Sequence, residues 1–315
     1  MPALLVCYIR GLLQGKKITT TSLLRQFGYS HDGLTRFLAE SFAWKKWYRF
    51  IVVHLFGILG GSGWIAIDDT VLAKPFGRVF PKACWVYDSS QKLHVFGYNL
   101  VMVVWSNGIV TIPLCWRWYR KNYKTKIEFA KSLLREVKDT WHISPTHVLM
   151  DAFYVADQIV DLLEEFGWKW VGRIKKNRIV NGCRLDEDLI IGGDTTIGYI
   201  ADRCQIKVVK YDHRYLATND LNLGNEDIPK EYLKRWCIEE TFRFFKQELH
   251  FAECQARSTK AQEKHLLCVS VSYLILQKEQ LATQTLYSIK EKFIFNQAWG
   301  YNRIKHYEAI LMAGA

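Results

Sequence analysis

Long hydrophobic runs, paired cysteines and prolines are all scarce in this sequence. The most apolar stretch, residues 100–118, is interrupted by Ser106, Asn107 and Gly108, so we predict no membrane-spanning helix. The eight cysteines include no Cys-x-x-Cys pair, which argues against a zinc site or a disulfide framework. Six prolines in 315 residues, together with 49% hydrophobic residues, exclude a Pro-rich or disordered chain and predict a folded core.

The start of the sequence lacks the features of a secretion signal. Its apolar run, residues 1–13, contains Arg10, and neither a basic segment before it nor a small-residue cleavage site after it is present. Such features are needed for export. We therefore expect the chain to stay in the cytosol.

Acidic residues are fewer than basic ones. The 43 Lys and Arg against 31 Asp and Glu give a formal net charge of +12, a balance typical of proteins that bind polyanions. Residues 1–57 hold eight basic and two acidic residues, and so contribute +6 of this charge. Nucleic acid is therefore the first partner that we expect.

Two short helices are predicted within residues 1–57. Thr21-Ser22 can cap one that ends near Gly28, and Ser30 can cap another. This order resembles a helix-turn-helix, and its basic surroundings suit DNA phosphates. A small helical region without DNA contact has the same pattern, so both interpretations of this basic N-terminal region stay open.

After the glycines of residues 60–63, the pattern changes to alternating strands and helices. Strands are predicted at 64–69, 95–105, 109–114, 146–150 and 168–174, and amphipathic helices at 126–141 and 155–166. This order predicts an α/β fold in which helices flank a mixed sheet. Residues 175–225 predict a β-rich insertion with a hairpin, and helices resume at residue 230 and again at 261–280.

The helix predicted from residue 230 has one polar and one apolar stripe. At about 100° per residue, its polar side chains fall within an arc of roughly 60°. They are Tyr232, Arg235, Glu239 and Lys246. The apolar ones are Ile238, Phe242, Phe245 and Leu249. A carboxylate between cations suits a metal ion and phosphates, but i,i+4 pairs of Glu239 with Arg235 and Arg243 on a solvated helix give the same pattern.

Acidic residues also follow two of the predicted strands. Asp68 and Asp69 end the first strand, and Asp151 follows the strand 146–150. Phosphodiester chemistry by two divalent cations needs about three carboxylates from separate elements, because ions about 3.5–4 Å apart must be charge-compensated. Asp69, Asp151 and Glu239 form such a set.

Together these motifs resemble the bacterial insertion-sequence transposases of the DDE class, which carry a Tyr-x2-Arg-x3-Glu-x6-Lys signature. The four signature positions are Tyr232, Arg235, Glu239 and Lys246. The resemblance extends through residues 67–70 with Lys74-Pro75, residues 148–151 and Arg257, over roughly residues 60–280. It implies a ribonuclease-H-like catalytic domain in two parts, 60–174 and 226–315 with the C-terminal helices, separated by the β-rich insertion 175–225.

The resemblance also implies roles for these side chains. Asp69, Asp151 and Glu239 would hold two Mg²⁺ ions, for which Mn²⁺ may substitute in such enzymes. Tyr232, Arg235 and Lys246 would bind DNA phosphates. Asp68 is the alternative to Asp69, because adjacent strand residues point to opposite faces; the Thr70 that follows favours Asp69.

The implied function is a metal-dependent DNA transposase. It would cut DNA at the inverted repeats of its insertion sequence and transfer the freed 3′-hydroxyl to target DNA, with a homodimer in the synaptic complex. It would lie in the bacterial cytoplasm, associated with the nucleoid when bound to DNA. Two alternatives are a metal-dependent nuclease of the same fold and a transposon-derived DNA-binding protein without catalysis.

Overall fold

A computed structural model describes most of the chain. The described residues are 2–15, 31–41, 43–57, 62–75, 77, 80–88, 91–185, 195–200, 203–280 and 284–313. The helices are α1 (Pro2–Gln14), α3 (His31–Ala39), α4 (Trp44–Phe56), α5 (Lys126–Asp139), α6 (Asp157–Phe166), α7 (Asp227–Leu233), α8 (Trp236–Gln247), the 3₁₀ helix η1 (Phe251–Glu253), α9 (Thr259–Glu279), α10 (Leu286–Phe295) and α11 (Gln297–Ala313). The strands are β1 (Trp64–Ala73), β2 (Cys84–Asp88), β3 (Leu93–Ser106), β4 (Thr111–Trp118), β5 (Val148–Met150), β6 (Trp170–Ile174), β7 (Ile179–Val180), β8 (Cys183–Arg184), β9 (Thr195–Ile200), β10 (Cys204–Tyr211) and β11 (Arg214–Thr218).

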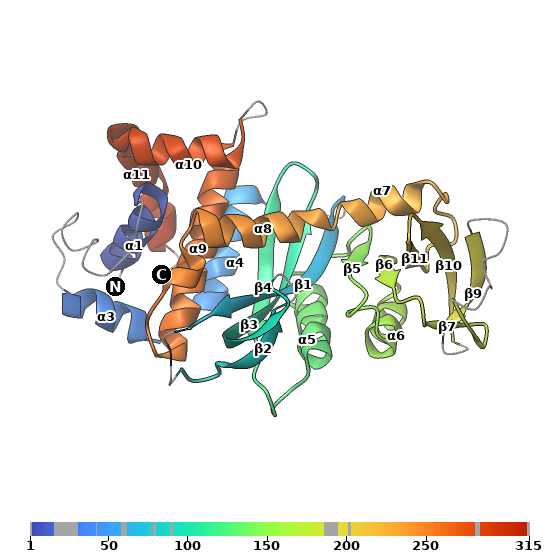
Figure 1. The fold of residues 1–315 in the computed structure, drawn as a ribbon. Helices are drawn as coiled ribbons and strands as arrows, with labels where there is room; N and C mark the ends of the chain where they lie inside the picture. Colours follow the sequence, from blue (N-terminus) through green and yellow to red (C-terminus); the bar gives the residue numbers. More distant parts are fainter. Residues whose placement is uncertain are drawn as a thin grey trace.

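A single mixed sheet runs through the molecule, with β1 near its centre (Figure 1). β1 pairs with β3 antiparallel on one side and with β5 parallel on the other. Ile65, Ala66 and Ile67 of β1 are fully buried, as expected for a central strand with both faces covered. The predicted α/β class with a helix-flanked mixed sheet is confirmed.

The long strand β3 pairs with two partners along its outer edge. Its first half pairs with β2 and its second half with β4, both antiparallel. The hairpin predicted between β3 and β4 is therefore present. β2 is a strand that the sequence pattern did not predict, because it is only five residues long and its apolar residues do not alternate with polar ones.

The strands of residues 175–225 continue the sheet on its other side. β5 pairs in parallel with β6, and β11, β10 and β9 follow in that order, each antiparallel to its neighbour. β7 and β8 form a separate two-stranded ribbon. The predicted hairpin across residues 212–213 is the β10–β11 pair, and it extends the sheet through β6.

Helices cover the two faces of this sheet. α5 contacts β3, β4 and α6, and its N-terminus carries a capping box in which Thr125 and Glu128 satisfy each other's backbone amides. α7 packs on β5, β6 and β11, and α8 packs on β1, β3 and β4. The predicted apolar stripe is buried at all four positions: Ile238, Phe242 and Phe245 of α8, and Leu249 just after its end.

The sequence predicts a single helix from residue 230. This prediction is wrong in one respect, because the structure has two helices there, α7 and α8. Lys234 and Arg235 separate α7 from α8, and the backbone there forms i→i+3 bonds such as Arg235 N–H to the Tyr232 carbonyl, 3.0 Å. These bonds are tighter than those of an α-helix. The chain keeps its direction through the junction, so α7 and α8 lie nearly end to end (Figure 1).

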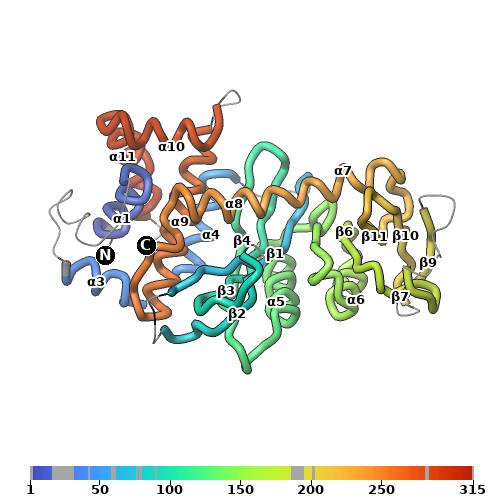
Figure 2. Tube along the Cα trace, viewed as in Figure 1, coloured from blue at the N-terminus to red at the C-terminus, as the bar shows by residue number. Residues whose placement is uncertain are grey.

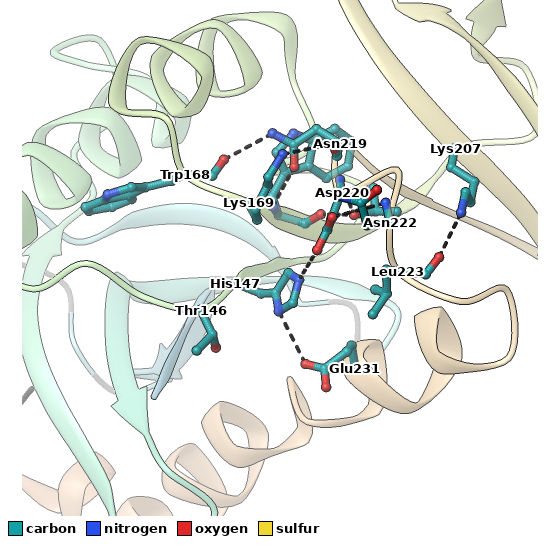
Figure 3. Close-up of polar contacts among 12 residues, drawn as sticks. Thr146, His147, Trp168, Lys169, Lys207, Asn219, Asp220, Asn222, Leu223 and Glu231 are labelled. Carbon is teal, nitrogen blue, oxygen red and sulfur yellow. Dashed lines mark hydrogen bonds and ion pairs between the residues drawn. The ribbon is translucent and has the colours of Figure 1, made fainter. Parts of the chain in front are cut away.

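A polar cluster fixes α7 beside the start of β5 (Figure 3). The His147 ring contacts Asp220 through Nε2 at 3.4 Å and Glu231 of α7 through Nδ1 at 3.5 Å. Asn219 binds the Trp170 backbone amide at 2.8 Å. Because β5 ends at Met150 and α7 leads into α8, this cluster positions the two segments that carry Asp151 and Glu239.

The remaining helices form a layer beside the sheet. α1 contacts α9, α10 and α11, and α3 and α4 contact α9 (Figure 2). Buried Lys290 of α10 donates to the carbonyls of Leu12 and Leu13 at 2.8 and 2.9 Å, which satisfies the free C-terminal carbonyls of α1. The predicted helix after Ser30 is α3, whereas the one predicted before Gly28 lies outside the described residues.

Membrane-spanning helices are absent from the described parts of the chain: none of those helices has the length and apolar character to cross a bilayer.

We expect Gly97→Ala to destabilise the protein by about 1–3 kcal/mol. Gly97 lies where β3 pairs with both β1 and β2, and a Cβ there would lie 2.2 Å from the Leu72 carbonyl oxygen, a backbone atom with no room to move. The measurement is the urea midpoint. As a control, Gly167→Asn should be nearly neutral, because Gly167 ends α6 in the left-handed conformation with open space around it. Equal loss in both variants would contradict this account.

Candidate active site

Five acidic side chains line one cleft of about 730 Å³. They are Asp68 and Asp69 of β1, Asp88 at the end of β2, Asp151 just after β5, and Glu239 of α8. Basic side chains line the same cleft: Lys121, Lys126, Arg243 and Lys246. The structure therefore brings together residues that are far apart in the sequence, because β1 and β5 are neighbouring parallel strands and α8 packs on β1.

Asp68 faces α8. Its Oδ2 accepts a hydrogen bond from Arg235 Nη1 at 2.8 Å, and the Nη2 of the same guanidinium contacts Glu239 Oε1. Arg235 thus lies between the two carboxylates and supplies their positive charge. Its side chain is 13% exposed, so this charge is only weakly screened by solvent.

The carboxyl group of Asp68 is protonated more easily than an ordinary one. Burial raises its pKa to about 7, the carboxylates of Asp151 and Asp69 add to the rise, and Arg235 opposes it. Desolvation and like charges both disfavour the charged form. Asp68 therefore loses its charge at a higher pH than an exposed aspartate does.

Asp69 has a different set of partners. Its Oδ2 accepts hydrogen bonds from Asn99 and Lys126, both at 2.7 Å, and its Oδ1 accepts one from Tyr154 at 2.9 Å. Both oxygens are thus occupied by donors from β3, α5 and the segment after Asp151. Alternation along β1 explains why the two neighbouring aspartates meet different partners.

Asp151 begins the turn between β5 and α6. Its Oδ1 accepts hydrogen bonds from the backbone amides of Phe153 and Tyr154, at 2.9 and 3.1 Å. This local turn holds the carboxyl group at the carboxyl end of a parallel strand, next to the equivalent edge of β1. Phe153, 47% exposed, lies beside it in the same cleft.

The four signature residues have unequal positions. Glu239 and Lys246 line the cleft; burial lowers the pKa of Lys246, and Asp88 opposes this effect. Arg235 binds the carboxylates, and Tyr232 lies against the guanidinium, 5.7 Å from ring centre to Cζ. Of the two i,i+4 partners considered for Glu239, Arg235 makes the ion pair, whereas Arg243 stacks on Trp236 at 5.4 Å.

The sequence pattern did not single out Lys126, Asn99 or Tyr154, which surround Asp69. Lys126 begins α5, Asn99 lies within β3 opposite Val71, and Tyr154 follows Asp151 by three residues. The one available signal was Asn99, a polar residue within the otherwise apolar strand β3. The structure buries this side chain fully, and buried amides need hydrogen-bond partners.

Lys74, part of the family resemblance, has a structural position. Its side chain is buried, and Nζ donates to the carbonyls of Ala252 and Cys254, both at 2.7 Å. Burial lowers the pKa of this lysine. Lys74 therefore ties the end of β1 to the turn that follows α8.

The chemistry of the donors suits a hard divalent cation. Carboxylate oxygens are the ligands that Mg²⁺ and Mn²⁺ prefer, and the carboxylates of Asp68, Asp151 and Glu239 line the same cleft. Among the residues that the structure describes, no three His, Cys, Asp or Glu side chains converge closely enough to hold a metal ion. Arg235 fills the space between Asp68 and Glu239 in this arrangement.

We expect Arg235→Gln to lower the free energy of unfolding by about 3 kcal/mol at pH 8, because it leaves a desolvated carboxylate without its cation. The loss should be smaller at pH 5. The pKa of Asp68 in the fold, about 7 against an ordinary 3.8, lies above the unfolded value, so the folded state binds more protons and stability falls as pH rises through this window. Without Arg235 this fall should be steeper.

Urea unfolding at pH 5 and pH 8 measures the difference. The double variant Asp68→Asn/Arg235→Gln should regain most of the stability lost at pH 8, because neither charge is then present. An equal loss for Arg235→Gln at both pH values would show that the guanidinium does not act on Asp68 through its charge.

Comparison with known proteins identifies the family. The family model described as "Transposase DDE domain" matches residues 60–275. The chain therefore belongs to the DDE-domain transposase family. The same range contains all five acidic residues of the cleft.

The fold resembles that of piggyBac transposase in its synaptic complex with hairpin DNA, solved by cryo-electron microscopy. The TM-score is 0.57 at 12% sequence identity, and the match covers 92% of this chain and 69% of the other. At that identity the likeness concerns the fold alone. A comparison with curated proteins found no match.

Proposed function

We propose, from membership of this family, that the protein is a metal-dependent DNA transposase. It cuts DNA at the inverted repeats of its own insertion sequence and joins the freed 3′-hydroxyl to target DNA. The observation that carries the proposal is the cleft in which carboxylates from β1, β5 and α8 lie under a rim of lysines and arginines. Carboxylates suit cations, and the basic rim suits the phosphates of DNA.

The sheet order supports a ribonuclease-H-like assignment. Three antiparallel strands, β4, β3 and β1, are followed by the parallel strands β5 and β6. In chain order these five strands are β1, β3, β4, β5 and β6. In this proposal one acid lies on the first of them, β1, one follows the fourth, β5, and one lies on the later helix α8. Residues 175–225, with β7 to β11, form the insertion before that helix.

For the metal ligands we propose Asp68, Asp151 and Glu239. The sequence favoured Asp69, but its two oxygens already accept three hydrogen bonds, whereas Asp68 shares Arg235 with Glu239. Two Mg²⁺ ions, or Mn²⁺, would activate the attacking hydroxyl and stabilise the leaving oxygen when bound. Asp69 then holds Lys126 and Tyr154 in position beside them.

The chain's other residues act on the DNA itself. Lys246 lines the cleft and provides a point charge for a phosphate. Arg235, once a metal compensates the carboxylates, has its guanidinium fork available for a phosphate. Tyr232 supports Arg235 from below.

Two protomers would act together, one at each inverted repeat. The piggyBac structure is a synaptic complex with hairpin DNA, which supports DNA as the partner. That the DNA is double-stranded and the assembly a homodimer belongs to this proposal. We place the protein in the cytoplasm of a bacterium, bound to the nucleoid through its DNA.

We expect Asp68→Asn, Asp151→Asn and Glu239→Gln each to reduce nicking at least about 100-fold, which corresponds to roughly 2.7 kcal/mol of barrier. Asp69→Asn should reduce it only about tenfold, because it weakens the support of Lys126. The assay follows nicking of a supercoiled plasmid that carries the DNA flanking the coding region, with Mg²⁺, Mn²⁺ or EDTA.

The informative result is which of the two substitutions, Asp68→Asn or Asp69→Asn, reduces nicking more. If Asp69→Asn abolishes nicking while Asp68→Asn retains it, the ligand is Asp69. If the wild-type protein binds the flanking DNA but nicks it with neither metal, the protein is a DNA-binding protein without catalysis. Nicking without strand transfer indicates a nuclease.

A further inference from the structure

The connection between β4 and α5, taken with the last two residues of β4 and the first of α5, is a strongly basic segment beside the cleft. Residues 117–126 contain five basic residues and no acidic one. They are Arg117, Arg120, Lys121, Lys124 and Lys126. This connection projects from the lower edge of the molecule (Figures 1 and 2). Nothing in the catalytic proposal requires a basic loop of this length.

The loop separates two clefts. On one side Tyr119, Lys121 and Lys126 line the cleft with the carboxylates. On the other side, Arg117, Arg120 and Tyr123 line a second cleft of about 520 Å³. Residues of one short segment thus contribute cations to both clefts.

The second cleft has a rigid aromatic floor. Trp116 and Trp118 are buried, and both indole N–H groups donate to the carboxylate of Glu263. Trp44 stacks on Trp116 with 5.1 Å between ring centres. Because these contacts fix the floor, the cations above it are held on a surface of defined shape.

Positive charge is in excess around this cleft. Lys45 and Arg117 share a single carboxylate, Glu136. Lys82 lies on the far rim. Arg120 and Lys124 are exposed, and in the described part of the chain neither forms an ion pair, nor does Lys82. Exposed unpaired cations from separate elements fit a ligand that carries several negative charges at intervals.

We propose that the loop 117–126, together with Lys82 across the second cleft, binds the phosphate backbone of double-stranded DNA where it leaves the catalytic cleft. The inference rests on the proposed function, since it is the DNA held at the carboxylates that continues over the loop. A duplex carries one charge per about 1.7 Å of its axis, so it meets cations on both sides of the loop. The contacts are with phosphates, and they are independent of DNA sequence.

Equilibrium binding in EDTA tests this without catalysis. The probe is a fluorescent 30-base-pair duplex of arbitrary sequence, titrated at several salt concentrations. For Arg120→Ala/Lys124→Ala we expect affinity at 0.1 M salt to fall about tenfold and the slope of log K against log salt to become shallower by about 1.8, since each phosphate contact contributes about 0.9. Lys82→Ala should reduce the slope by about 0.9.

A matched control removes the same charge elsewhere. Lys210 of β10 and Lys305 of α11 are exposed and line neither cleft, so Lys210→Ala/Lys305→Ala should keep affinity within about twofold and the slope unchanged. Equal losses in the two double variants would overturn the proposal, because net charge alone would then explain binding. So would an unchanged slope in Arg120→Ala/Lys124→Ala, or a loss confined to single-stranded probes.

The outcome is separable from the catalytic proposal. Asp68→Asn/Glu239→Gln should not nick, yet in this background Arg120→Ala/Lys124→Ala should still make the salt slope shallower by about 1.8. Where the wild type nicks, Arg120→Ala/Lys124→Ala should raise KM several-fold with kcat within about twofold, since the loop contributes binding only. A wild-type protein that fails to nick, with the loop effect intact, refutes the transposase chemistry and leaves the DNA surface standing.

Discussion

Repulsion between acidic side chains in a partly dehydrated space is the constraint on which this structure depends. The carboxylates of Asp151 and Asp69 lie close enough to Asp68 to raise its pKa, and cations offset this repulsion. Arg235 balances Asp68 and Glu239, and Lys126 balances Asp69. These cations come from the α7–α8 junction and from the start of α5, so the electrostatics of the centre also fix how the helices meet the sheet.

The sequence is sufficient to predict those helices and strands whose apolar residues recur with a clear period. The strands around Asp68 and Asp151, the helix α5 and the buried stripe of α8 follow from apolar spacing, and the structure confirms them. Short elements escape such analysis: β2 is five residues long. The junction at Lys234 and Arg235 escapes as well, because both residues are good helix formers and the change is only from i→i+4 to i→i+3 bonding.

The site shows a similar division. Residue type and periodicity indicate Asp69, Asp151 and Glu239 as candidates, and the family resemblance adds the signature residues. Alternation predicts that Asp68 and Asp69 face opposite ways without telling which one faces α8. That depends on which side of β1 the helix packs, a tertiary fact. Likewise Asn99, Lys126 and Tyr154 reach Asp69 from three elements, and no local pattern relates them.

The helical layer beside the sheet joins distant parts of the chain. Leu5, Ile9, Leu12 and Leu13 of α1 are buried, and α1 packs against α9, α10 and α11, which the ribosome makes long afterwards. Until those helices are synthesised, α3 is the one helix with which α1 makes its native contacts in the described chain, so most of this apolar face stays exposed. The helical layer can therefore assemble only late, after α11 has been synthesised.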